Sequence, residues 1–228
     1  NYDVGLAFDG DADRVGVVDE KGHVLWADEL MSIFLPDIIK NGEDILFDVK
    51  CSQALEDMIN HYGGNPIMWK TGHSLIKQKM TEVGCKFGGE MSGHIFFADD
   101  YYGYDDAIYV AARLLELLSK TNKSLSELRS IIPVYHSTPE MRMEAKNDEE
   151  KFKITKKAIE YFTKNYDCNT VDGVRILFGD GWGLVRSSNT QPVIVCRFEA
   201  NSIDRRDEIM NLVLNKLKEF GDLKLGGH

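Results

Sequence analysis

Residues 4–18 read VGLAFDGDADRVGVV, and the interpretation of the chain's fold and chemistry starts from this stretch. Its two short apolar ends are typical of β-strands, so the acidic centre is expected to be a loop between two strands. The carboxylates stand at alternate positions, Asp9, Asp11 and Asp13. Alternate side chains of an extended segment share a face, so these groups are expected to converge. Mg²⁺ prefers such oxygen ligands and would relieve their repulsion, which predicts a magnesium site.

Three other interpretations of this loop were weighed. An EF-hand loop would place Glu20 at its twelfth position, but Arg14 occupies the sixth, where the sharp turn needs glycine. The flanks also have strand character, so the EF-hand is rejected. A solvated acidic turn remains open. So does a phosphatase in which Asp9 is the nucleophile and Asp11 the acid.

The composition excludes some classes of partner. The 228 residues allow one or two domains, and 43% of them are hydrophobic. The formal charge of −10 argues against nucleic acid or an anionic membrane as a partner, and requires any phosphate site to be a local basic cluster. Four scattered cysteines without a CxxC pair predict neither a disulfide framework nor a cysteine metal site. No signal peptide or membrane span is predicted, so the expected location is the cytoplasm.

The order of the expected elements predicts an α/β protein with more than one domain. Strands and helices alternate through residues 23–136, which predicts a three-layer-type mixed-sheet domain. Residues 130–139 contain two prolines and are expected to be a linker, and 137–228 are expected to form an α+β domain. The hairpin in 1–22 is expected to be the end of another α/β domain, because an isolated hairpin is marginally stable in water. Strands are predicted near 23–26, 44–49, 66–69, 174–178, 182–186 and 193–199, with shorter ones on either side of 88–94; helices are predicted near 28–39, 52–62, 74–83, 106–118 and 149–166, with a last one ending near 220.

Two further loops carry polar groups suited to a sugar and a phosphate. Between glycines, residues 89–94 present a carboxylate, a hydroxyl and an imidazole, from Glu90, Ser92 and His94. This set suits the hydroxyl groups of a sugar, although a plain loop is the alternative. Residues 186–190 offer a forked cation, hydroxyls and turn amides for a phosphate, from Arg186, Ser188, Asn189 and Thr190. An ordinary turn is the alternative there. Lys50 and His73 follow predicted strands, where α/β sheets place ligand-binding groups.

Together, four segments resemble the α-D-phosphohexomutases, and most closely the bacterial phosphomannomutase/phosphoglucomutase group. They are 9–14, 70–75, 89–94 and 186–190, and they occur in the order of the family. The resemblance implies an enzyme of four domains around one cleft, with a phosphorylated serine in the first. The metal, sugar and phosphate loops belong to the second, third and fourth. This chain resembles the end of the second domain followed by the third and fourth.

The resemblance also implies a role for each matching residue. Asp9, Asp11 and Asp13 would bind Mg²⁺, with Arg14 beside them in the active site. Glu90 and Ser92 would hold sugar hydroxyls, and Lys50, His73 and His94 would line the sugar and phosphate positions. The non-reacting phosphate would be bound by Arg186, Ser188, Asn189 and Thr190. Met91 is similar to the mannose/glucose enzymes, whereas the glucosamine-phosphate mutases more often have Gln there.

The implied reaction is the interconversion of hexose 1-phosphate and 6-phosphate through the phosphoserine and a bisphosphorylated sugar. The expected partners are a hexose phosphate and the missing N-terminal domains. No serine of this chain lies in the family's phosphoserine loop, so this chain alone is expected to lack turnover and to bind metal weakly. An aspartyl-phosphate phosphatase-like enzyme and a non-catalytic module that binds sugar phosphates remain as alternatives.

Overall fold

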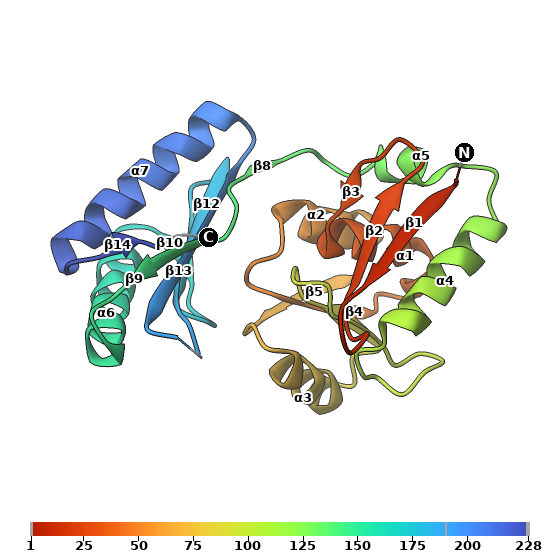
Figure 1. Cartoon of the computed structure of the whole chain (residues 1–228), viewed down its shortest axis with the longest axis horizontal. Helices are drawn as coiled ribbons and strands as arrows, with labels where there is room; N and C mark the ends of the chain where they lie inside the picture. The colour runs from red at the N-terminus through yellow and green to blue at the C-terminus, as the bar shows by residue number, and fades with distance from the viewer. Residues whose placement is uncertain (1, 190, 227–228) are drawn as a thin grey trace. The chain divides into compact units, whose positions relative to one another are not determined.

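The computed structural model of the protein describes residues 2–189 and 191–226. The chain divides after Pro133 into unit 1 (Asn1–Pro133) and unit 2 (Val134–His228), and each unit has its own sheets and helices (Figure 1). The two units are described separately below.

The acidic loop joins two antiparallel strands, as the sequence predicts. β1 (Val4–Phe8) pairs with β2 (Val15–Asp19), and β3 (Val24–Leu25) extends this sheet on the other side of β2. Two backbone hydrogen bonds fix the loop to the rest of unit 1: the Ala107 amide donates to the Ala12 carbonyl at 3.0 Å, and the Val15 amide to the Gly93 carbonyl at 3.4 Å. The hairpin is therefore anchored at the start of α4 (Ala107–Ser119) and at the 89–94 loop.

The second sheet of unit 1 is mixed. Its strand order is β5-β4-β6-β7, in which β5, β4 and β6 are parallel and β7 is antiparallel to β6. The strands are β4 (Asp44–Asp48), β5 (Asn65–Trp69), β6 (Phe87–Gly89) and β7 (Ile95–Phe97). The helices besides α4 are α1 (Ala27–Ile38), α2 (Gln53–His61), α3 (His73–Val83) and α5 (Leu125–Arg129). Because three strands are parallel, their carboxyl ends lie at one edge of the sheet, which is where the site forms.

Helices cover both faces of this mixed sheet (Figure 1). On one face, Phe34 of α1 meets the rings of Phe87 and Phe97 edge-on, with centroids 6.1 and 5.2 Å away. On the other, Ile76 and Met80 of α3 form a buried cluster whose members also include Leu46 and Phe96. Neighbouring strand residues thus point to opposite helical layers. This confirms the predicted α/β class with a mixed sheet between helices.

Unit 2 has a predominantly antiparallel sheet with the order β10-β11-β12-β13-β9-β14, and β8 also pairs with β13. Its buried core combines residues of the central strands with residues of α6 (Asp148–Asn165) and α7 (Ile203–Phe220). The strands are β8 (His136–Ser137), β9 (Met141–Glu144), β10 (Asp167–Asn169), β11 (Val174–Leu177), β12 (Gly181–Ser187), β13 (Val193–Ala200) and β14 (Lys224–Leu225). Strands and helices in this arrangement agree with the predicted α+β class.

Several short elements were not predicted, and one expectation needs correction. Part of the expected linker 130–139 is the strand β8, which pairs with the end of β13. The helix α5 and the strands β9, β10 and β14 were also not predicted. All of these elements have five residues or fewer, too few to show a hydrophobic period, and pairing with neighbours defines the strands. Among the described residues, no helix has the length and apolar character that crossing a bilayer requires.

Candidate functional site

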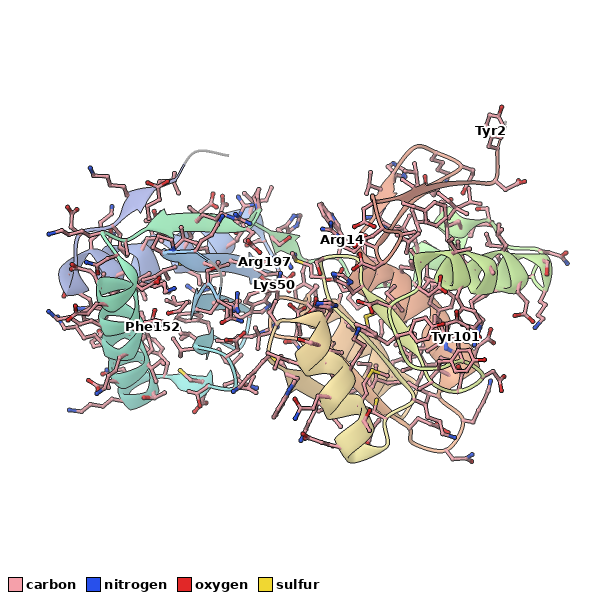
Figure 2. All side chains as sticks on the ribbon, turned by 60° about the horizontal axis from the view of Figure 1, so that its bottom comes forward. Tyr2, Arg14, Lys50, Tyr101, Phe152 and Arg197 are labelled. Carbon is pink, nitrogen blue, oxygen red and sulfur yellow. The ribbon has the colours of Figure 1, made fainter. Side chains whose placement is uncertain are left out.

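Asp48 connects the loops that follow the three parallel strands of unit 1. It is the last residue of β4 and is fully buried. Its Oδ1 accepts a hydrogen bond from the Met91 amide at 3.1 Å, and its Oδ2 accepts one from Thr71 Oγ1 at 2.8 Å. The ammonium group of Lys50, a residue labelled in Figure 2, lies 3.9 Å from Oδ2, and the Lys50 side chain is also buried. One carboxylate thus fixes the loop after β5, the loop after β6 and the lysine after β4.

Glu90 and Ser92 form a second buried polar pair in the same unit. The Glu90 side chain accepts hydrogen bonds from the Gly72 amide through Oε1 and from Ser92 Oγ, 3.2 Å away, through Oε2. Burial raises the pKa of Glu90, and the charge of Asp48 raises it further. A carboxylate has about four acceptor sites, so Glu90 can still accept hydroxyl hydrogens. Ser92 uses its own hydrogen toward Glu90 and would face a ligand as an acceptor.

His73 and His94 come together around Asp105, at the start of α4. The Nδ1 atoms of the two rings lie 2.9 and 3.1 Å from Asp105 Oδ2, and the rings stack with centroids 5.3 Å apart. The ammonium group of Lys77 donates to Asp105 Oδ1 at 2.8 Å. Burial acts to raise the pKa of Asp105, but the hydrogen bonds from Lys77 and His73 outweigh it and lower the pKa. Asp105 therefore stays ionised between the two imidazoles.

The acidic loop brings its carboxylates together as predicted. One oxygen each from Asp9, Asp11 and Asp13 lies within 4.8 Å of the others. Arg14 Nε donates to Asp9 Oδ2 at 2.6 Å, and Ala12 has a left-handed φ of 59°, uncommon for a residue other than glycine. This conformation and the Arg14 contact hold the loop in its tight shape.

Asp13 has the features of a cation ligand. Its Oδ1 is buried and accepts no hydrogen bond from the part of the chain that the structure describes. Burial raises the pKa of Asp13; the charge of His94 opposes this, and the like charges of Asp11 and Asp9 add to it. A divalent cation would compensate the repulsion and give this oxygen a partner, so the donor set fits Mg²⁺.

The acidic loop and the 89–94 loop lie against each other. A Cβ atom added to Gly93 would come within 3.1 Å of Arg14 Cβ, and Gly93 has a φ of 114°, which glycine adopts most readily. His94 Nδ1 lies 3.6 Å from Asp13 Oδ2. Unit 1 therefore brings the acidic loop, His73, Glu90, Ser92 and His94 into one network, with Lys50 joined to it through Asp48.

In unit 2, Arg186 is near the end of β12 and is buried. Its Nε donates to Asp172 Oδ2 at 2.8 Å. Its Nη2 is buried too and has no hydrogen-bond partner among residues 2–189 and 191–226. Ser188 is buried in the turn that follows, Asn189 is exposed, and Thr190 lies outside the described residues. A guanidinium donor without a partner beside a polar turn is suited to an anion.

Lys151, on α6, supports this turn and was not predicted as a site residue. Its ammonium group is buried and donates to the carbonyl oxygens of Ser188 at 2.9 Å and Gln191 at 3.0 Å. It also lies 2.8 Å from Asp148 Oδ1. The turn is thus held by a lysine that is distant in sequence. Asp48 and Asp105 were missed in the same way.

Comparison with known proteins agrees with this geometry. The family model described as phosphoglucomutase/phosphomannomutase, alpha/beta/alpha domain III, matches residues 26–135, and the model of the C-terminal domain of the same family matches 140–216. The chain belongs to the phosphoglucomutase/phosphomannomutase family. This membership supports the mutase hypothesis over the phosphatase-like alternative.

Individual members of the family resemble the chain over nearly its whole length. The phosphomannomutase/phosphoglucomutase of Pseudomonas aeruginosa is 48% identical over 222 residues, which is 96% of this chain and 48% of that protein. The Pseudomonas putida protein of the same name is 50% identical over 207 residues, 88% of this chain and 44% of that protein. A solved phosphoglucomutase/phosphomannomutase family protein from Burkholderia thailandensis has a TM-score of 0.86 and 40% identity, over 96% of this chain and 48% of its own. The chain thus spans about half the length of the relatives it matches.

Proposed function

We propose that this chain supplies the metal, sugar and distal-phosphate sites of a phosphohexomutase that interconverts the 1- and 6-phosphates of mannose, glucose or both. The transferred phosphoryl group would come from a phosphoserine in a part of the enzyme outside this sequence. One observation carries the proposal: the loops after β4, β5 and β6 and the acidic loop form one hydrogen-bonded network in unit 1. We infer the class of sugar from the names of the relatives, which are phosphomannomutase/phosphoglucomutase and phosphoglucomutase.

We infer that Asp9, Asp11 and Asp13 hold Mg²⁺. Their mutual approach supports this role, as does the lack of a hydrogen-bond partner for the buried Asp13 Oδ1 among the described residues. When bound there, the ion would polarise the phosphoryl group on the serine. Arg14, tied to Asp9, places a fixed positive charge beside the same group and can stabilise negative charge in the transition state.

Glu90 and Ser92 would bind hydroxyl groups near the middle of the sugar. Glu90 offers its remaining acceptor sites, and Ser92 offers oxygen lone pairs. Contacts in the middle of the ring serve both orientations of a bisphosphorylated sugar, which the reaction requires. Lys50 and the two histidines, His73 and His94, would line the phosphate side of the sugar. In the tautomer of His73 that donates from Nδ1 to Asp105, Nε2 would be the nitrogen able to accept a hydroxyl proton.

The turn after β12 would hold the phosphate that does not react. Arg186 has a buried nitrogen without a hydrogen-bond partner in the described chain, and Ser188 and Asn189 flank it, with Thr190 next in sequence. Arg186 can bind a phosphate through two nitrogens only if its plane is fixed, and the Nε bond to Asp172 fixes it.

A chimera tests the proposal. Its front half comes from the Pseudomonas aeruginosa enzyme and its second half is this chain. We expect it to convert glucose 1-phosphate to glucose 6-phosphate in a dehydrogenase-coupled assay, whereas this chain alone shows no turnover. Arg186→Ala in the chimera should mainly raise KM. The control Arg205→Ala removes an arginine paired with Asp180 and should leave KM unchanged. An unchanged KM and kcat in Arg186→Ala would refute the phosphate assignment.

Binding by the chain alone is a separate measurement. We expect mannose 1-phosphate with Mg²⁺ to bind measurably, because unit 1 contains the side chains that we propose to bind the sugar and the metal. Binding without any activity of the chimera would favour the non-catalytic module that the sequence left open.

A further inference from the structure

Unit 1 contains a second group of metal-ligating atoms, distinct in chemistry from the three carboxylates of the acidic loop. One atom from each of Asp13, His73, His94 and Asp105 lies within 4.8 Å of the others. The atoms that the ion pairs identify are two imidazole nitrogens and two carboxylate oxygens. We propose that these four side chains form a site for a borderline divalent cation such as Zn²⁺.

Three of the six separations among the four ligand atoms are close to those of a tetrahedral site. Zn²⁺ binds imidazole and carboxylate at about 2.0–2.2 Å, so ligands of a tetrahedron are about 3.3 Å apart. His73 Nδ1 and His94 Nδ1 lie 2.9 and 3.1 Å from Asp105 Oδ2, and His94 Nδ1 lies 3.6 Å from Asp13 Oδ2. These separations lie on both sides of the required value. The other three separations are within 4.8 Å, so the side chains would have to move closer together around a bound ion.

His94 Nδ1 gives independent support. This nitrogen is buried and makes no hydrogen bond with any described residue, although Asp105 Oδ2 is only 3.1 Å away. The Asp105 oxygen already takes part in the hydrogen bond to His73. A buried ring nitrogen of this kind is available as a metal ligand.

The surroundings of the site also suit a metal. Asp105 would use Oδ2 for the cation while Oδ1 keeps its 2.8 Å hydrogen bond from Lys77. Ligating carboxylates are commonly held by such an outer partner, which fixes their orientation. His73 is half exposed, so a hydrated ion can reach the site from solvent.

The donor set selects the metal. Imidazole nitrogens favour Zn²⁺, Ni²⁺ or Cu²⁺, whereas Mg²⁺ favours an all-oxygen set such as Asp9, Asp11 and Asp13. The two sites share Asp13, so both cannot be filled with full coordination. If the proposed function is correct, Zn²⁺ would remove one magnesium ligand and both histidines from the reaction, and would inhibit the enzyme.

Titration of this chain with Zn²⁺ alone, in competition with a chromophoric chelator, tests the site without requiring catalysis. We expect saturable binding of one Zn²⁺ that weakens about tenfold or more in His73→Asn and in Asp105→Asn. His61→Asn, which removes an exposed histidine of α2, and Cys168→Ser, which removes the partly exposed thiol, serve as controls and should bind as the unaltered chain does. His73 is exposed enough that its substitution leaves the fold intact, which circular dichroism would verify.

Asp11→Asn distinguishes the two sites. Asp11 belongs to the acidic loop but not to the proposed set, so this variant should bind Zn²⁺ as tightly as the unaltered chain. X-ray absorption should show two imidazoles around the metal. The proposal is overturned if Asp11→Asn weakens Zn²⁺ binding as much as His73→Asn does, if His73→Asn and Asp105→Asn have no effect, or if the chain binds no Zn²⁺. These outcomes would leave the proposed mutase function standing, because that function requires only the acidic loop to bind metal.

Discussion

Replacing Asp48 with asparagine should destabilise the loops at the carboxyl ends of β4, β5 and β6, which carry the site of unit 1. The substitution keeps the shape of the side chain but removes its charge. Asp48 is fully buried and accepts hydrogen bonds from the Met91 amide, Thr71 Oγ1 and Cys51 Sγ. The amide group of asparagine can serve only some of these donors, because one of its two polar atoms is itself a donor.

The size of the effect follows from these contacts. A hydrogen bond to a charged acceptor contributes about 1.5–3 kcal/mol, and one to a neutral acceptor about 0.5–1.5 kcal/mol. In Asp48→Asn the hydrogen bonds from Met91 and Thr71 would have a neutral acceptor in place of a charged one. The free energy of unfolding of unit 1 should therefore fall by about 2 kcal/mol. Asp48→Ala leaves both donors unsatisfied at about 1–3 kcal/mol each, so a loss of about 4 kcal/mol is expected.

Native-state hydrogen exchange in urea, measured on peptides by mass spectrometry, can resolve the effect by region. Peptides of unit 1 should lose protection in Asp48→Asn, with the largest change at residues 70–73 and 89–94. Peptides of unit 2 act as the internal reference. Asp37→Asn, at an exposed position of α1, is the matched control and should change stability by no more than about 0.5 kcal/mol. Equal protection in Asp48→Asn and the unaltered chain would refute the role given to this carboxylate.

Three further predictions concern other buried or hydrogen-bonded groups. Burial raises the pKa of Glu90 above its ordinary 4.5, so the folded chain holds this proton more tightly than the unfolded chain and loses stability as the pH rises above that value. Glu90→Gln should flatten this decline in urea unfolding at a series of pH values, and an unchanged slope would contradict the assignment. The hydrogen bond from Ser126 Oγ lowers the pKa of Glu20 to about 2. In Ser126→Ala, a carboxyl NMR titration should show the pKa of Glu20 returning toward 4.5. A normal pKa of Glu20 in the unaltered chain would argue against the hydrogen bond from Ser126. Lys151→Met removes the donor to the carbonyl oxygens of Ser188 and Gln191 and should lower the free energy of unfolding of unit 2 by about 2–4 kcal/mol. The same hydrogen-exchange experiment measures this loss. Unchanged protection of unit 2 would show that Lys151 does not stabilise the turn after β12.

The sequence predicted the loops that carry chemistry because they interrupt regular patterns. Apolar runs on both sides of the acidic loop predicted a hairpin, and β1 and β2 confirm it. Lys50, His73 and Glu90 were placed after strands by hydrophobic pattern alone, and the parallel order of β5, β4 and β6 explains why those positions meet. The convergence of Asp9, Asp11 and Asp13 was predicted from alternation along an extended segment, but the physical reason differs. Residues 9–14 form a turn between β1 and β2 in which Ala12 has a φ of 59°, and this turn brings the three carboxylates together.

The residues that sequence reasoning missed act across long stretches of chain. Asp48 ends an apolar strand, and nothing nearby indicates that it accepts hydrogen bonds from residues 23 and 43 positions away. Asp105 stands directly before a predicted helix, yet it bonds to His73 and Lys77 from α3. Lys151 was one of several charges on a surface helix, and only the fold shows that its ammonium group is buried. Contacts of this kind depend on tertiary packing, which no local pattern encodes.

The charges of the unit 1 network favour the binding of a cation there. Six carboxylates belong to it, Asp9, Asp11, Asp13, Asp48, Glu90 and Asp105, against three permanent cations, Arg14, Lys50 and Lys77. An anionic sugar phosphate would therefore meet a net negative field in unit 1, apart from whatever charge the two histidines carry. A divalent ion in the acidic loop would cancel most of that excess. If the acidic loop binds Mg²⁺ as proposed, the affinity of this protein for a sugar phosphate should fall when the metal is removed.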